Sequence, residues 1–113
     1  MLLKAGVDIS RLRPEIRKKL SILVDAFEGL EEVELTITST FEGTHSAGSL
    51  HYAHLAIDIR SGDNGYVTVN TLKEGLGPDY DVVWEGDHIH IEYDPKPVLS
   101  PPKNGVSYLS RLE

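Results

Sequence analysis

Apolar side chains recur at helical spacing near the start of the chain. From Pro14 to Phe27 they stand three or four residues apart with basic residues between them, which predicts an amphipathic helix. Pro14 suits the first turn of this helix, and Gly29 is expected to end it. Residues 67–76 are also predicted to form a short helix, although several of them are β-branched.

Other stretches have the period of a strand. Residues 33–39 and 55–60 alternate apolar and polar side chains, which predicts two half-buried strands. Residues 80–84 and 88–93 are predicted to pair as a hairpin. The Gly-, Ser-, Thr- and His-rich residues 40–53 are expected to form an ordered loop. Residues 1–12 are expected to form an extended lead-in.

These elements predict a single α+β domain, in which the N-terminal helix packs on a small, mainly antiparallel sheet. The 113 residues are enough for one compact domain and too few for two. The domain is assigned to residues 1–95. Residues 96–113 are rich in proline and poor in apolar side chains, so they are expected to form a tail laid over the surface.

Composition and charge exclude several classes of partner. The net charge of −7 argues against nucleic-acid binding, which needs basic groups to displace counterions from phosphates. No apolar run approaches the length of a transmembrane helix, so membrane insertion is not expected. The absence of cysteine excludes disulfides, thiolate catalysis and cysteine-based zinc sites. The N-terminus lacks the apolar core of a signal peptide, which favours synthesis in the cytoplasm.

Four of the five histidines fall in two short clusters, residues 51–58 and 85–92, each with a carboxylate close behind. His51 and Asp58 are seven residues apart, which is roughly 23 Å on a straight strand and about 10 Å on a helix. Neither spacing brings both side chains to one metal ion, whose ligands lie about 2 Å away. A shared site therefore requires a bend between them, which is expected at residues 52–53.

His88 and His90 are two residues apart, so on a strand their side chains point to the same side. Ile89 and Ile91 then face the core. A His-x-His pair by itself is more typical of a solvated strand face. On that surface the first cluster could meet both histidines, and catalytic zinc sites use three nitrogen or oxygen ligands from the protein and leave a fourth position open for water.

The order of these residues resembles a known family. Ser49, His51, Ala56 and Asp58, followed by the sequence of residues 87–90, resemble the zinc D-Ala-D-Ala carboxypeptidase and L-Ala-D-Glu endopeptidase family and the hedgehog signalling domain, which shares its fold. The resemblance spans roughly residues 5–95 and is closest over residues 43–52 and 87–90. The whole chain is further similar to small phage and prophage proteins of this family.

The resemblance implies one zinc ion held by three ligands, His51, Asp58 and His90. It places the catalytic carboxylate at Asp87. His88 and His45 would line the site, and His88 would stabilise the developing oxyanion.

Two alternatives remain open for the site. Strict alternation puts Asp87 on the face opposite His90, unless the strand begins near His88 after a turn at Gly86. Glu85 is therefore a competing catalytic carboxylate.

Two positions differ from many members of the family. His54 stands where they have glycine, so a bulkier residue must make the bend, and His54 is also an alternative fourth ligand. Glu42 stands near the place of an arginine thought to hold the oxyanion or a substrate carboxylate.

The function implied is that of a zinc-dependent metallopeptidase, a hydrolase that cleaves peptidoglycan stem peptides. It would act as a D,D-carboxypeptidase or an L-Ala-D-Glu-type endopeptidase in phage lysis or cell-wall remodelling. A protein made in the cytoplasm would need release or holin-type export to reach that substrate. The alternative is a catalytically inactive, hedgehog-like zinc-binding recognition module, because fold alone does not assign function.

Overall fold

The structure, a computed structural model, describes residues 1–42, 49 and 51–95. His45 and the predicted tail over residues 96–113 lie outside the described residues. The elements follow one another along the chain as β1 (Leu2–Leu3), α1 (Pro14–Arg17), α2 (Leu20–Glu31), β2 (Thr36–Ser39), β3 (Ala56–Arg60), α3 (Gly65–Leu76), β4 (Tyr80–Trp84) and β5 (His88–Tyr93).

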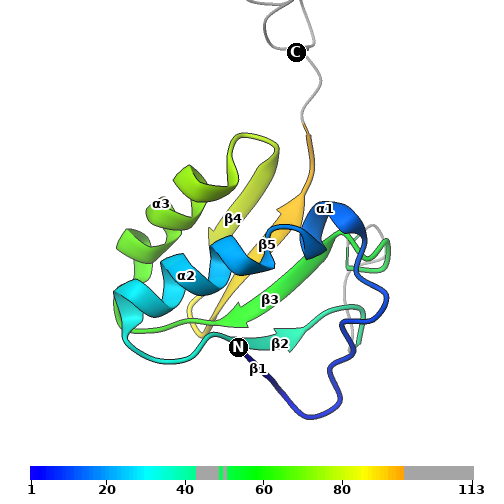
Figure 1. Ribbon diagram of the computed structural model, residues 1–113, viewed down its shortest axis with the longest axis horizontal. Coiled ribbons are helices and arrows are strands. Elements are labelled where there is room, and N and C mark those ends of the chain that lie inside the picture. Colours follow the sequence, from blue (N-terminus) through cyan, green and yellow to red (C-terminus); the bar gives the residue numbers. More distant parts are fainter. Residues whose placement is uncertain (43–48, 50, 96–113) are drawn as a thin grey trace, which may run out of the picture.

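The strands form one sheet in the order β1-β2-β3-β5-β4 (Figure 1). β1 pairs with β2 in parallel, and every other neighbouring pair is antiparallel. The predicted α+β class with a mainly antiparallel sheet is therefore confirmed. The expected hairpin is also present, because β4 pairs with β5 along the whole length of β4.

The two faces of the sheet differ in chemistry. Ile57 and Ile59 of β3, together with Ile89 and Ile91 of β5, are buried in a core that includes side chains of all three helices. Because successive strand residues point to opposite faces, the residues between these isoleucines face the other side. That side is polar, and among the described residues no helix covers it (Figure 1). It is the surface on which a site can form.

The single helix predicted over residues 14–27 is wrong in two respects. The chain breaks after Arg17 and resumes as α2 at Leu20, so that α1 contacts β5 while α2 packs on α3. α2 then continues through Gly29 to Glu31. It ends where Glu32 takes a left-handed conformation, with φ of 59°. A glycine inside a helix costs only about 0.5–1 kcal/mol relative to alanine, which the packing of α2 outweighs.

The strand predicted from residue 33 begins at Thr36 instead, because α2 occupies the chain to Glu31. Val33, expected on the buried face, is 57% exposed. Leu35 and Ile37 are fully buried, as the alternation predicts. β3 and α3 begin within two residues of their predicted starts.

Candidate metal centre

The elements that carry the predicted ligands meet on the polar face of the sheet. Asp58 of β3 lies directly opposite His90 of β5 in the antiparallel register. His51 lies in the turn over residues 51–54 that leads into β3. The turn confirms the predicted bend, and His54 makes it with a left-handed φ of 61°. Its amide donates a hydrogen bond to the carbonyl of His51 (3.0 Å), which brings the His51 ring back over the strand.

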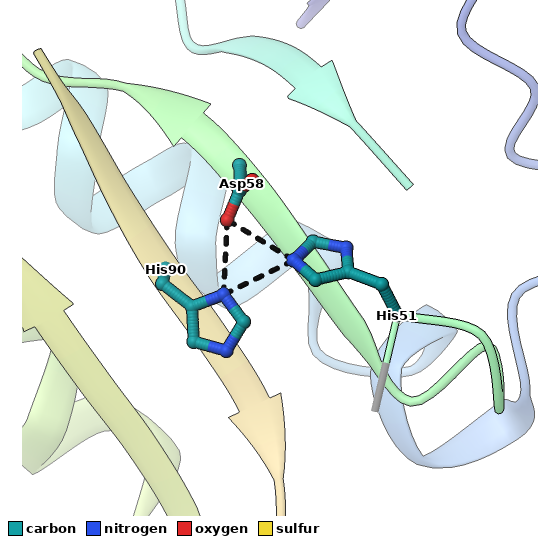
Figure 2. A group of neighbouring side chains, drawn as sticks. All are labelled: His51, Asp58 and His90. Carbon is teal, nitrogen blue, oxygen red and sulfur yellow. Dashed lines mark hydrogen bonds and ion pairs between the residues drawn. The ribbon is translucent and has the colours of Figure 1, made fainter. Parts of the chain in front are cut away.

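The ligand atoms of the three residues form a nearly equilateral triangle (Figure 2). Nε2 of His51 is 3.1 Å from Nδ1 of His90 and 3.3 Å from Oδ1 of Asp58, and the remaining side is 3.0 Å. Ligands in a zinc tetrahedron lie about 3.3 Å apart when each bond is about 2.0 Å long. The three atoms are therefore spaced as three corners of such a tetrahedron.

The far nitrogen of each histidine is held by a group that only accepts hydrogen bonds. Nδ1–H of His51 donates to the carbonyl of Thr40, and Nε2–H of His90 donates to the Glu92 carboxylate at 2.6 Å. A neutral imidazole with one nitrogen protonated presents a lone pair at the other. When both imidazoles are neutral, two lone pairs and the Asp58 carboxylate point at one spot, an arrangement that suits a metal cation. This group fits a metal ion.

Burial strengthens the electrostatic interactions among these side chains. His51 is 2% exposed and Asp58 9% exposed. Burial by itself raises the pKa of Asp58, but the hydrogen bonds with His51 and His90 outweigh it and hold that pKa well below its usual range. The hydrogen bond with Asp58 raises the pKa of His90 to about 9, against the opposing effect of burial and with a further contribution from Glu92. In the metal-free protein a proton on His90 compensates the carboxylate.

Zinc binding is therefore expected to release about one proton at neutral pH. The pKa of His90 in the folded, metal-free protein is raised to about 9, so below that pH the metal must displace a proton. Apparent affinity should rise about tenfold per pH unit from pH 7 to near 9 and then level off. Calorimetric titration in buffers of different ionisation enthalpy measures the proton count. Affinity independent of pH over this range would contradict the assignment.

Glu42 supports His51 indirectly, through Thr40. The Glu42 carboxylate accepts hydrogen bonds from the Thr40 amide (2.9 Å) and the Asp8 amide (2.6 Å), and Thr40 is 1% exposed. Partial burial raises the pKa of Glu42, but the hydrogen bonds from Thr40 and Asp8 outweigh it, so the pKa is lowered. Glu42 therefore fixes the Thr40 carbonyl that orients His51. The amide of His51 in turn donates to Ser49 Oγ at 3.1 Å.

A cleft of about 490 Å³ opens beside the ligand triangle, lined by Lys4, Thr38, Asp58, Arg60, Ser61, Asp87 and His88. β5 starts at His88, and Gly86 has a φ of 92°. The turn required to bring Asp87 to this side is thus present. Asp87 lines the same cleft as Asp58, the candidate metal ligand.

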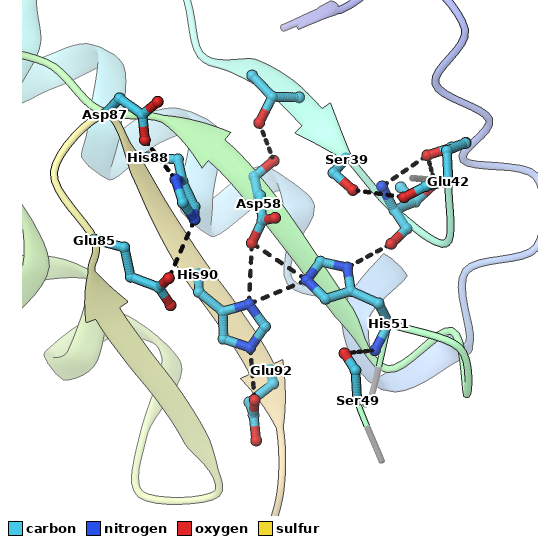
Figure 3. A network of polar contacts seen from close by, with 12 residues as sticks. Ser39, Glu42, Ser49, His51, Asp58, Glu85, Asp87, His88, His90 and Glu92 are labelled. Carbon is cyan, nitrogen blue, oxygen red and sulfur yellow. Dashed lines mark hydrogen bonds and ion pairs between the residues drawn. The ribbon is translucent and has the colours of Figure 1, made fainter. Parts of the chain in front are cut away.

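Both candidate carboxylates contact His88 (Figure 3). Oδ1 of Asp87 is 2.7 Å from Nδ1 of His88, and Oε2 of Glu85 is 3.4 Å from its Nε2. The hydrogen bond with Asp87 raises the pKa of His88 and lowers that of Asp87 itself. Of the two carboxylates only Asp87 is among the described residues that line the cleft, which favours Asp87 as the candidate catalytic carboxylate.

The alternative in which His54 is a fourth ligand is wrong for this geometry. The His54 ring packs edge-on against Phe41, with ring centroids 5.2 Å apart. It does not join the described group of ligand atoms that lie within 4.8 Å of one another.

Sequence reasoning missed two supporting groups, the Thr40 carbonyl and Glu92. Glu92 had a usable signal, because it follows His90 by two residues and so shares its strand face. The Thr40 carbonyl had none, because its position depends on the fold of the loop. The structure also gathers three half-buried carboxylates at Asp81, Glu92 and Asp94. That group offers oxygen alone and lacks the nitrogen ligands that zinc prefers.

Glu92→Ala should weaken zinc binding by about 10–100-fold, the usual effect of removing a carboxylate that orients a ligating histidine. Glu92→Gln keeps a hydrogen-bond acceptor and should recover part of the loss. Competition with a chromophoric chelator measures the affinity. Glu74→Gln, on the exposed surface of α3, provides the control and should bind zinc like the wild type. Equal affinity in all four proteins would show that Glu92 does not support the site.

No protein-family model matches the chain, and a search of curated proteins finds no match. The family resemblance therefore stays a prediction from the motifs. Among the described residues, no helix is both long and apolar enough to cross a membrane.

Proposed function

We propose that this protein is a zinc-dependent metallopeptidase that acts on peptidoglycan stem peptides. The observation that carries the proposal is the convergence of His51, Asp58 and His90 on one spot at the edge of an open cleft. Two imidazoles and one carboxylate are the ligand types of catalytic zinc sites, whose fourth position takes water or substrate. Imidazole nitrogen disfavours Mg²⁺ and Ca²⁺, which prefer oxygen.

The surrounding residues fit the acid–base work of hydrolysis. When bound, zinc lowers the pKa of its water toward neutrality and polarises the scissile carbonyl. Asp87 accepts the proton of the attacking water and passes it to the leaving nitrogen. His88 favours its charged form because of its hydrogen bond with Asp87, and a cation there stabilises negative charge on the carbonyl oxygen.

The choice of peptidoglycan rests on the motif resemblance, which points to the D-Ala–D-Ala bond or the L-Ala–D-Glu bond of the stem peptide. A phage lysis or wall-remodelling role follows from the same resemblance. In that role the protein reaches the wall by release from the cell or by holin-type export.

The direct test is digestion of purified peptidoglycan with zinc-loaded protein, followed by analysis of the soluble fragments and new amino groups. Asp87→Asn should reduce the rate by about 10²–10⁴-fold, the usual contribution of a general base. Glu85→Gln should change it little. Zinc content is measured in each variant, because a carboxylate outside the ligand set leaves the metal in place. Cleavage by Asp87→Asn at the wild-type rate, with loss in Glu85→Gln, would reassign the base to Glu85. No cleavage by any of the zinc-loaded proteins would reject the peptidase.

One observation favours a second function. Glu42 occupies the region of the family's arginine and uses its carboxylate to hold Thr40 and Asp8, so it supplies no cation to a reacting carbonyl. A zinc-bearing recognition module accounts for a complete ligand set without that cation. Stoichiometric zinc and tight binding of wall fragments, without cleavage, would identify this function.

A further inference from the structure

The cleft beside the metal centre contains two cations, Lys4 and Arg60. The protein has 18 acidic against 11 basic residues, so two cations in one small cleft run against its overall charge. No ion pair or side-chain hydrogen bond joins either of them to another described residue. Their charges are therefore available to a ligand.

The sheet places both cations on the same face as the metal ligands. Arg60 follows Asp58 by two residues on β3, and its register partner on β5 is His88. Lys4 directly follows β1, and its amide donates a hydrogen bond to the carbonyl of Ile37, which sets Lys4 beside Thr38 at the cleft. Arg60 and His88 thus form a row next to the row of Asp58 and His90, and Lys4 lines the same cleft beside Thr38 of β2.

The two carboxylates that line the same cleft, Asp58 and Asp87, are each hydrogen-bonded to histidine. Asp58 is directed at the metal position through Oδ1, with both ligand histidines against it. Asp87 is hydrogen-bonded to His88 at 2.7 Å. The part of the cleft around Arg60 and Lys4 is therefore suited to an anion. The planar guanidinium of Arg60 matches a carboxylate, with which it can form two parallel hydrogen bonds.

We propose that Arg60 and Lys4 bind the free α-carboxylate of the amino acid whose nitrogen leaves when the peptide is cut. The inference rests on the proposed function for its substrate. The two candidate bonds share this group: the last D-Ala of a D-Ala–D-Ala end carries it, and so does D-Glu when the stem continues through its γ-carboxyl. In both, the carboxylate is attached to the carbon next to the scissile nitrogen.

The dimensions agree with this arrangement. Same-face neighbours on a strand are about 7 Å apart, which separates the backbone of Arg60 from that of Asp58. One residue of a bound peptide covers up to about 3.8 Å, and the long Arg60 and Lys4 side chains span the rest. A peptide with its scissile carbonyl at the metal centre therefore presents its α-carboxylate to the two cations. These cations take the place of the one that Glu42 does not supply.

The test compares acid and amide forms of two small peptides by calorimetric binding. The first pair is N-acetyl-D-Ala-D-Ala and its C-terminal amide. The second is N-acetyl-L-Ala-D-Glu and N-acetyl-L-Ala-D-isoglutamine, in which the α-carboxylate of D-Glu is an amide. All titrations use zinc-loaded protein with the Asp87→Asn substitution, and chromatography afterwards verifies that the peptides are intact.

Amidation should weaken binding of at least one pair by about 10–100-fold, as expected for loss of hydrogen bonds to charged groups. The peptide pair whose binding is weakened by amidation identifies the bond that the protein cuts. In the Lys4→Gln/Arg60→Gln protein the acid should bind as weakly as the amide, whereas Arg60→Lys should retain part of the preference. Lys73→Gln, which removes one positive charge from the exposed surface of α3, should retain all of it.

Two results would overturn the proposal: binding that amidation does not change, or a preference for the acid that survives loss of both cations. Failure of every acid peptide to bind at millimolar concentration would overturn it as well. These outcomes differ from failure of the proposed function. A recognition module would bind the acid peptide through Arg60 without cutting it, and a peptidase with a different carboxylate site would cut peptidoglycan in the Lys4→Gln/Arg60→Gln protein at the wild-type rate.

Discussion

Asp58→Asn is expected to abolish stoichiometric zinc binding, lowering the affinity by more than about 100-fold. Asparagine has the size of aspartate but loses the negative charge that offsets the metal. Asp58 is the anionic member of a buried triangle whose other members are neutral imidazoles when zinc is bound. Loss of that charge should therefore exceed the effect of altering a residue outside the ligand set, which is about 10–100-fold.

Zinc content after dialysis and chelator competition measure this change. Asp25→Asn makes the same substitution at an exposed position of α2 and should leave zinc at one ion per chain. If Asp58→Asn retained one zinc with wild-type affinity, Asp58 would not be a ligand.

Chelation of zinc is expected to lower the melting temperature by roughly 10–20 °C. At free zinc about 1,000 times Kd, binding stabilises the folded state by about 4 kcal/mol, and each kcal/mol shifts the melting of a domain of this size by roughly 4 °C. The structural reason is that the ligands join three separate segments, the turn that contains His51, β3 and β5. A metal ion bound there would hold the turn onto the sheet.

Thermal unfolding with and without EDTA, at fixed protein concentration, makes this measurement. The Asp58→Asn protein is the control, because a chain that binds no zinc should melt at the same temperature in both conditions. A wild-type melting temperature unchanged by EDTA, after verified loss of the metal, would contradict the link between the site and stability.

The sequence predicted those parts of the fold that depend on local pattern. Alternation located the β4–β5 hairpin and placed Ile89 and Ile91 in the core, opposite His90. The candidate metal-binding group could also be predicted, because His51 and Asp58 can share a site only if the chain bends between them. The structure has that bend at residues 51–54.

The parts that failed depend on contacts between distant segments. Nothing local distinguishes one helix over residues 14–27 from two, because both keep the same apolar spacing. The break follows from the different partners of α1 and α2. Gly29 was expected to end the helix, but the helix ends at Glu31, and the residue after it, Glu32, has the left-handed conformation. Glu42 likewise has a use that only the fold reveals, since Asp8 and Thr40 approach it from separate parts of the chain.

A crystal structure with anomalous data collected at the zinc absorption edge tests directly whether His51, Asp58 and His90 bind one zinc ion. We expect one peak, about 2.0–2.2 Å from Nε2 of His51, Nδ1 of His90 and Oδ1 of Asp58. Zinc-loaded crystals without a peak there, or with their only peak at the carboxylates of Asp81, Glu92 and Asp94, would contradict it.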